Sequence, residues 1–324
     1  MLRILDAHHD RFGLSRPFRI ARGTKTVADV VTVHIRQGDA VGRGEGVPYP
    51  RYGETIDGAL AVIESARSAI EGGAGRREVL ELMPAGAARN AVDAALHDLE
   101  ARLDGAVVAM PTTLIETAVT IVIDTPSAMA RAAHAVAGVP LVKVKVDGEQ
   151  VADRIRAVRA ALPDARMIVD PNESWNAAIL EVALPVLIEA RVDLLEQPLP
   201  ADDDAALARF AGRIAIAADE AGHGIADLPR LKGSYSHINI KLDKTGGLTA
   251  ATALADAAEA QGFGLMLGCM VCSSLGIAPA LALAPRAAFV DCDGPWWLRD
   301  DREGGVRIEG GYLHPPAPGF WGGA

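Results

Sequence analysis

Short apolar runs recur along the chain between residues 115 and 290. Alanine-rich helical patterns fill most of the gaps between them, as at 151–161 and 248–260. Buried strands that alternate with helices at near-constant spacing are typical of a closed (β/α) barrel. A doubly wound open sheet is the competing architecture, but it normally needs fewer strands, so the pattern favours the barrel. The runs cover residues 119–123, 141–144, 167–169, 192–195, 214–218, 238–240, 264–267 and 287–290.

The first part of the chain has a different pattern. Residues 30–35 alternate between apolar and polar like a strand, and glycines and prolines at 42–50 predict turns after it. From residue 58 to Gly105 the pattern is helical, and Gly105 is placed as a helix stop. Strands followed by helices predict a compact α+β unit. The apolar face of its last helix consists of Val92, Ala95, Leu96, Leu99 and Leu103.

Composition and charge narrow the class of protein. Half of the 324 residues are hydrophobic, which excludes a disordered chain, and the net charge of −10 argues against nucleic acid or an anionic membrane as a partner. Three cysteines do not make a disulfide framework and indicate a reducing compartment. Asp6 comes too early for a signal peptide, and no apolar stretch is long enough to span a bilayer. We expect a soluble cytoplasmic protein, with a homo-oligomer left open.

Charged residues stand at the C-terminal ends of most apolar runs. In a (β/α) barrel these ends meet on one face, which is where active sites are built. A strand must run into a polar loop somewhere, so one such charge has little meaning, but a charge at most of the ends indicates a site. The residues concerned are Lys143, Lys145, Asp170, Glu196, Asp219, Lys241, Asp291 and Asp293.

The chemistry of these residues predicts a metal and two bases. Asp170, Glu196 and Asp219 follow three successive runs, and three converging carboxylates need a cation, for which Mg²⁺ suits an all-oxygen donor set. Lys145 and Lys241 follow the second and sixth runs, on opposite sides of a barrel, and could exchange a proton with either face of one carbon. The alternative is that the lysines only neutralise the carboxylates.

A second expectation concerns the lysine pair on the second run. Lys143 and Lys145 stand two residues apart on one predicted strand, so their side chains point to the same side. Each ammonium group should therefore lower the pKa of the other toward that of a useful base.

Five motifs in order resemble the muconate-lactonizing-enzyme subgroup of the enolase superfamily. They are Lys143-Val-Lys145, Asp170-Pro-Asn172, Glu196-Gln-Pro198, Asp219-Glu220 and Lys241 within 239–247. The resemblance implies an α/β protein with a modified TIM barrel, (β/α)₇β, under an N-terminal α+β capping domain. It also implies one Mg²⁺ per subunit and removal of a proton α to a carboxylate. We expect the capping domain at 1–114, the barrel at 115–296 and a C-terminal segment at 297–324 that returns to the cap.

The last run ends in Asp291-Cys-Asp293, which resembles the Asp-x-Asp motif that holds the free ammonium group of the substrate in dipeptide epimerases. Segments 22–23, 48–54, 86–90 and 266–270 resemble the L-Ala-D/L-Glu epimerases of murein recycling. In that family the resemblance assigns Lys145 and Lys241 as bases and Asp170, Glu196 and Asp219 as Mg²⁺ ligands. The substrate contacts that it implies are Lys25, Thr120, Lys143, Cys269, Asp291 and Asp293.

One cap residue departs from that family pattern. The family carries an arginine that binds the glutamate side chain of the substrate, and Lys25 stands at that position here. Lysine keeps the positive charge but cannot form the bidentate hydrogen bonds of a guanidinium group with a carboxylate. Arg22 could supply a partner for that carboxylate or pack at the base of the loop, and Tyr52 could contact substrate or pack.

Together these features predict Mg²⁺-dependent epimerisation of dipeptides of the L-Ala-D-Glu and L-Ala-L-Glu type. The predicted mechanism is two-base 1,1-proton transfer through a metal-stabilised enediolate. An N-acylamino acid racemase, another enolate-forming enzyme of the subgroup and a non-catalytic paralogue are the alternatives. The presence of both lysines and all three carboxylates argues against the paralogue.

Overall fold

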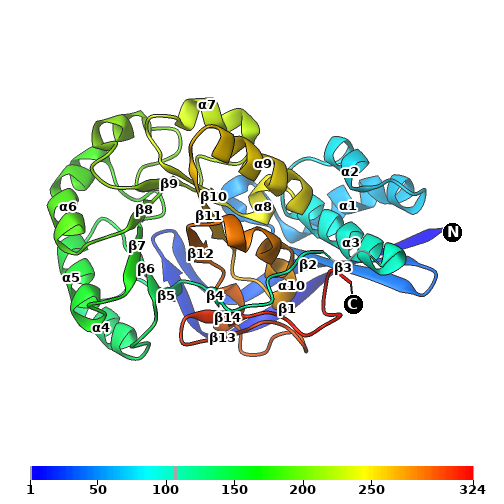
Figure 1. Cartoon of the computed structure of the whole chain (residues 1–324), viewed down its shortest axis with the longest axis horizontal. Coiled ribbons are helices and arrows are strands. Elements are labelled where there is room, and N and C mark those ends of the chain that lie inside the picture. Colours follow the sequence, from blue (N-terminus) through cyan, green and yellow to red (C-terminus); the bar gives the residue numbers. More distant parts are fainter. Residues whose placement is uncertain (1, 106–107, 324) are drawn as a thin grey trace.

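Eight parallel strands form a nearly closed barrel in the computed structural model, which describes residues 2–105 and 108–323. The strands neighbour one another in chain order, and the first and last strands meet where the Ala118 N–H donates to the Val290 carbonyl at 2.8 Å. Figure 1 shows the barrel surrounded by its helices. The strands are β5 (Val119–Ile121), β6 (Leu141–Lys145), β7 (Arg166–Asp170), β8 (Leu194–Glu196), β9 (Ile216–Ala218), β10 (His237–Ile240), β11 (Gly264–Gly268) and β12 (Phe289–Asp291).

A helical segment connects each barrel strand to the next, so the predicted (β/α)₇β barrel is confirmed and the open sheet is wrong. Each predicted apolar run overlaps one of the strands, and two helices begin and end at the predicted residues, 151–161 and 248–260. The helices are α4 (Pro126–His134), α5 (Val151–Ala161), α6 (Ala177–Glu189), α7 (Leu228–Leu231), α8 (Leu242–Thr245), α9 (Leu248–Ala260) and α10 (Ser274–Ile277), with 3₁₀ helices at Ala205–Phe210, Ile225–Asp227, Pro279–Arg286 and Gly294–Trp297.

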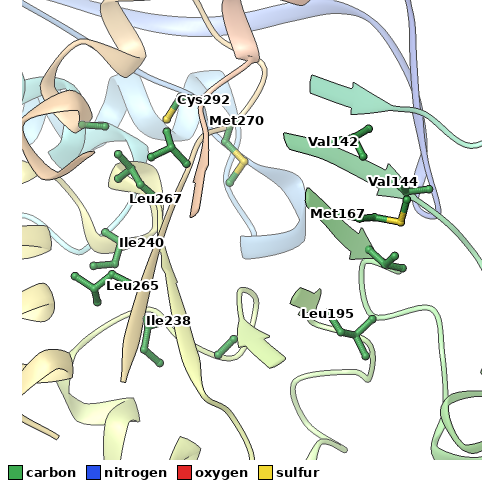
Figure 2. Close-up of a cluster of buried hydrophobic side chains, with 14 of the residues drawn as sticks. Val142, Val144, Met167, Leu195, Ile238, Ile240, Leu265, Leu267, Met270 and Cys292 are labelled. Atoms are coloured by element: carbon green, nitrogen blue, oxygen red, sulfur yellow. The ribbon is translucent and has the colours of Figure 1, made fainter. Parts of the chain in front are cut away.

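Side chains alternate between the two faces of each barrel strand, and this alternation builds the site. Outward-facing residues such as Val142 and Val144 pack in the main core between sheet and helices, part of which is drawn in Figure 2. Inward-facing residues near the strand starts fill the barrel with a separate apolar cluster. The inward positions near the strand ends carry the charges, so one mouth of the barrel is polar. The apolar cluster consists of Ala118, Leu141, Ile168, Leu194, Ala217, Met266 and Phe289.

The capping domain is a three-stranded antiparallel sheet covered on one face by helices (Figure 1). Of the predicted helix face, Val92, Ala95, Leu96 and Leu99 are buried, but the prediction for Leu103 is wrong, since it is 39% exposed. It lies one turn beyond the contact between Leu99 and the sheet, and the helix ends at Gly105 with a left-handed φ of 67°. The elements are β1 (Arg3–Ile20), β2 (Gly23–Gln37), β3 (Ala40–Gly46), a 3₁₀ helix at Pro50–Tyr52, α1 (Ile56–Glu71), α2 (Arg76–Leu82) and α3 (Ala87–Asp104).

The glycines at 42, 44 and 46 lie within β3, so the predicted turns at these positions are wrong. Helix α3 packs directly against the strand there. A Cβ atom on Gly42, Gly44 or Gly46 would lie 2.0, 2.0 or 2.1 Å from a backbone oxygen of α3. Glycine marks a close approach of two backbones here rather than a turn.

We expect Gly44→Ala to destabilise the cap. The added Cβ would lie 2.0 Å from the Ala91 carbonyl oxygen, and only a backbone shift can relieve that overlap. Overpacking of this kind costs about 3 kcal/mol of unfolding free energy. Denaturant unfolding measures the loss, with Gly224→Ala as the matched control because a Cβ there meets no atom of the described structure within 4 Å. Equal midpoints for the two variants would contradict this packing.

The C-terminal segment crosses from the barrel back to the cap. Strand β13 (Arg307–Glu309) pairs with β14 (Tyr312–His314), which in turn pairs with β4 (Ile115–Glu116). The Trp321 indole N–H donates to the Arg43 and Ala94 carbonyls at 3.0 and 3.2 Å. These contacts support the predicted boundaries at 114 and 296, which stay predictions. Within the described ranges, none of the helices combines the length and apolar character that a membrane crossing requires.

Candidate active site

The polar mouth of the barrel opens into a cavity that the cap sheet covers. Asp170 and Glu196 are fully buried beneath it, and both form ion pairs with Lys143. The other nine predicted site residues line the cavity directly. These are Lys25, Thr120, Lys143, Lys145, Asp219, Lys241, Cys269, Asp291 and Asp293.

Lysine ammonium groups lie between the three predicted metal ligands. Lys143 Nζ is 3.1 Å from Asp170 Oδ2 and 2.6 Å from Glu196 Oε2. Lys241 Nζ is 2.6 Å from Asp219 Oδ2 and 4.0 Å from Glu196 Oε1. The structure therefore gathers Asp170, Glu196 and Asp219 in one buried network, with their oxygens bridged by cations rather than in direct contact.

The donor chemistry of this network fits a hard divalent cation. Burial raises the carboxylate pKa values, but Lys145 holds that of Asp170, and Lys241 that of Asp219, below the usual range. Burial and the Asp170 charge raise the pKa of Glu196 to about 8. Within the described chain, Glu196 Oε2 and Asp219 Oδ1 accept no hydrogen bond despite their ion pairs. Three buried carboxylates, two of which have an oxygen that accepts no hydrogen bond, are suitable ligands for Mg²⁺.

Lys145 and Lys241 come from opposite sides of the barrel, at the ends of β6 and β10. The Lys145 ammonium group donates to Asp170, while the Lys241 ammonium group donates to Asp219 at 2.6 Å. Burial lowers the pKa of Lys241, but Asp219 and Glu196 outweigh this effect and raise it above its usual value. Each lysine is thus held beside a predicted metal ligand while its side chain lines the cavity.

The predicted lowering of the pKa of Lys143 is wrong. Burial does lower it, but the carboxylates of Asp291, Glu196 and Asp170 surround the ammonium group and hold its pKa well above the usual value. The expectation considered only the neighbour on the same strand, whereas the barrel brings carboxylates from three other strands. Lys143 is therefore a fixed positive charge in this structure.

The Asp291 and Asp293 carboxylates lie across the cavity from the cap. Asp291 Oδ2 accepts from Lys143 Nζ at 2.7 Å, and Asp293 Oδ2 accepts from the Thr120 N–H at 2.9 Å and the Trp297 indole at 3.2 Å. Burial and the Asp291 charge raise the pKa of Asp293 to about 7. The charge of Asp291 on Asp293 makes a cation beside Asp293 favourable.

Lys25 lies at the cap side of the cavity, with its Nζ 4.7 Å from the centre of the Tyr49 ring. Arg22 also lines the cavity, but its guanidinium group is 2.7 Å from Glu220 Oε1 and donates to the Asn172 carbonyl at 3.0 Å. Its charge is therefore already engaged by the barrel. Lys25 is the more available cation for an anionic substrate group.

Two further residues position the predicted ligands. The Asn172 backbone N–H donates to Asp170 Oδ1 at 2.8 Å, and Gln197 Oε1 accepts from the Asp219 N–H at 2.9 Å. Both residues have a left-handed backbone conformation, with φ of 48° and 34°. This conformation is strained and is frequent at functional sites. Sequence reasoning quoted both motifs but gave these residues no role. Asn172 follows Asp170 by two residues and Gln197 directly follows Glu196, and this proximity in sequence could have indicated their positioning role.

The cap also contributes apolar residues that sequence reasoning missed. Phe18 and Ile20, at the end of β1, line the cavity together with Tyr49, Tyr52 and Met270. No chemical signature distinguishes Phe18 and Ile20 from other strand residues. The hairpin that carries them over the barrel mouth follows from tertiary packing.

Two family models match most of the chain. The N-terminal domain model of mandelate racemase and muconate lactonizing enzyme matches residues 6–110, and the enolase C-terminal domain-like model matches residues 127–320. The chain belongs to the enolase superfamily. The fold and motif resemblance found in the sequence are thereby confirmed.

Two curated relatives within this superfamily are similar over nearly the whole chain. The L-Ala-D/L-Glu epimerase of Escherichia coli K12 is 47% identical over 97% of this chain and 100% of its own length. An N-acetyl-D-glutamate racemase of a Pseudoalteromonas species is 42% identical over 91% of this chain and 96% of its own length. The two differ in whether the amine of the substrate is free.

Two solved structures are also similar. An Agrobacterium tumefaciens enolase family member with homology to dipeptide epimerases, with bound sodium and L-Ala-L-Glu, is 47% identical with a TM-score of 0.96, covering 99% of this chain and 100% of that one. A dipeptide epimerase of Enterococcus faecalis V583, complexed with Mg and L-Leu-L-Tyr, is 30% identical with a TM-score of 0.90, covering 98% and 99%.

Proposed function

We propose that this protein is a Mg²⁺-dependent dipeptide epimerase that interconverts L-Ala-D-Glu and L-Ala-L-Glu. The observation that carries the proposal is the placement of Lys145 and Lys241 on opposite sides of one cavity. A racemase or epimerase without a redox cofactor needs a proton acceptor on one face of the α-carbon and a donor on the other. These two lysines meet that requirement.

Asp170, Glu196 and Asp219 would hold the metal. Their full burial and oxygen-only chemistry support this role. A bound Mg²⁺ supplies Lewis-acid stabilisation of negative charge on a substrate carboxylate. Asn172 and Gln197 keep the ligand-bearing turns in place through the hydrogen bonds described above.

The lysines would move the proton. The lysine facing the α-proton would start as the neutral amine and remove it, and the opposite lysine would start as ammonium and deliver a proton to the other face, which inverts the centre. A divalent cation held by Asp170, Glu196 and Asp219 would offset the carboxylate charge that raises the pKa of Lys241, and so would favour the neutral amine. We assign Lys145 to the D face and Lys241 to the L face. Lys143, a fixed cation at the same end of β6, would stabilise charge that develops on the substrate carboxylate.

The remaining residues would select the substrate. Asp291 and Asp293 would receive the free ammonium group of the dipeptide beside Thr120. Lys25 would pair with the side-chain carboxylate of the second residue, because it lines the cavity and its charge is less engaged than that of Arg22. Cys269 would close the wall of the cavity between these groups. The similarity to the Escherichia coli L-Ala-D/L-Glu epimerase supports this substrate.

N-acylamino acid racemisation is the second candidate, favoured by the 42% identity to the N-acetyl-D-glutamate racemase. The Asp291 and Asp293 pair argues against it. Asp291 is already paired with Lys143. An acylated amine carries no charge, so the buried Asp293 carboxylate would be left without an ion-pair partner among the described residues, which is costly. The same proton-transfer residues would serve both kinds of substrate. The two candidate functions therefore differ in whether the substrate amine is free or acylated.

We expect acetylation of the substrate amine to lower kcat/KM for L-Ala-L-Glu by at least 100-fold. Loss of a charged, desolvated partner of a carboxylate costs about 3 kcal/mol, which corresponds to that factor. Polarimetry or chiral chromatography of L-Ala-L-Glu and its N-acetyl derivative under identical conditions measures the ratio. Equal rates for the two would support the racemase instead.

We place the reaction in the recycling of murein peptides in the cytoplasm. L-Ala-D-Glu is a dipeptide of murein, and the acidic chain with few cysteines fits a reducing compartment.

A further inference from the structure

A cluster of metal-type ligands lies on the cap sheet, away from the barrel. Asp6 and His8 on β1 and His34 on β2 each offer a donor atom, and these atoms lie within 4.8 Å of one another. In the part of the chain that the structure describes, no other three His, Cys, Asp or Glu residues meet this criterion. Asp6 Oδ2 is 3.1 Å from His8 Nδ1 and 3.9 Å from His34 Nδ1.

The strand register fixes this cluster. Asp6 stands directly opposite His34 in the antiparallel pair, and His8 follows two residues after Asp6 on the same face. All three side chains are at least one-third exposed, so an ion can reach them from solvent. The pairing of β1 with β2 therefore holds the three ligand-bearing residues close together without a bound ion.

The donor set differs from that of the barrel site. Two imidazoles and one carboxylate suit borderline first-row cations such as Zn²⁺ and Co²⁺ rather than Mg²⁺. Ligands about 2.0–2.1 Å from a tetrahedral ion lie about 3.3 Å apart. The observed distances of 3.1 and 3.9 Å need only small side-chain rotations to match.

A further carboxylate supports one of the imidazoles. Asp10 Oδ2 is 3.5 Å from His8 Nε2, the ring nitrogen that faces away from Asp6. That same oxygen accepts from Thr32 Oγ1 at 2.8 Å and from Arg302 at 3.0 Å. A carboxylate fixed behind a histidine orients the ring and raises its affinity for a metal.

Nearby positive charge does not cancel the cluster. Arg302, which contacts Asp10, is also paired with Glu45 at 2.8 Å.

We propose that Asp6, His8 and His34 form a second metal site, specific for a borderline divalent cation such as Zn²⁺ or Co²⁺, that joins β1 to β2 on the cap. β1 is the edge strand of the cap sheet, so the ion would pin its N-terminal half to the neighbouring strand. The site is separate from the barrel carboxylates and does not depend on the proposed epimerase activity.

Cobalt titration of the full chain in excess Mg²⁺ tests this site. Mg²⁺ saturates the oxygen-rich barrel site, and Co²⁺ bound by two imidazoles and a carboxylate in low coordination gives strong visible absorption. We expect one equivalent of Co²⁺ to produce these bands in the unmodified protein, with loss of the bands in His8→Ala and His34→Ala. Asp10→Asn should weaken binding by about 10–100-fold, because it removes only the supporting carboxylate.

His9→Ala is the matched control. His9 is the next residue on β1, points to the other face and lies 2.8 Å from Asp29, so its removal should leave the Co²⁺ bands unchanged. Melting curves in Mg²⁺ buffer show whether each variant is folded, and Zn²⁺ should raise the Tm of the unmodified protein and of His9→Ala but not of His34→Ala. Absent bands in the unmodified protein, or equal bands in folded His34→Ala, would overturn the proposal.

Discussion

Glu196→Gln is expected to abolish the turnover of L-Ala-L-Glu while the fold persists. Glutamine has the shape of glutamate and keeps an oxygen that can accept from the Asn239 side chain, as Glu196 does at 2.9 Å. It removes the charge that, in our account, binds Mg²⁺ together with Asp170 and Asp219. Lewis-acid stabilisation contributes several kcal/mol, so kcat should fall by about 1,000-fold or more.

The control is a second buried carboxylate outside the site. Asp243 accepts from the Val47 N–H and the Asn90 side chain, and burial raises its pKa to about 7. Asp243→Asn should leave turnover within a few-fold of the unmodified rate, because it also turns a buried acid into an amide but touches no ligand. Calorimetric Mg²⁺ titration should show greatly weakened binding in Glu196→Gln alone. Full activity of folded Glu196→Gln, or activity that survives chelation, would contradict the metal assignment.

The fold could be predicted because two periodic signals survive in the sequence. Buried barrel strands leave short apolar runs, and the helices between them leave their own pattern, as at 151–161. The wrong predictions concern residues whose type is compatible with two different structural roles. Gly44 permits close approach of α3 rather than a turn, and Leu103 continues a helical pattern past the end of its packing surface.

The candidate site was predictable for a related reason. Inward positions at the strand ends carry chemistry that a core would not tolerate, so residues such as Asp170 and Lys241 stand out in the sequence. Their partners do not. Lys244 lies within the 239–247 motif but was given no role there, yet its buried ammonium group donates to the carbonyls of Gly222 and Asn239 at 3.0 and 2.9 Å. Such contacts depend on packing between segments that are distant in the chain.

Lys145→Ala and Lys241→Ala should each reduce epimerisation by about 1,000-fold or more. A missing proton donor or acceptor costs about 100- to 10,000-fold, and nothing replaces it on the vacant face. Each variant keeps one lysine, which can still remove and return a proton on its own face. Lys232→Ala is the matched control, because this lysine is exposed in the segment before β10 and does not line the cavity. It should epimerise at the unmodified rate.

The most direct test of two-base proton transfer follows α-deuteration of each epimer in D₂O by NMR. The unmodified protein should place deuterium in both epimers. Lys241→Ala should exchange the α-proton of L-Ala-D-Glu alone, and Lys145→Ala that of L-Ala-L-Glu alone, each with retention of configuration. If both variants exchange the same epimer, or either still interconverts the two at an appreciable rate, Lys145 and Lys241 are not the two bases.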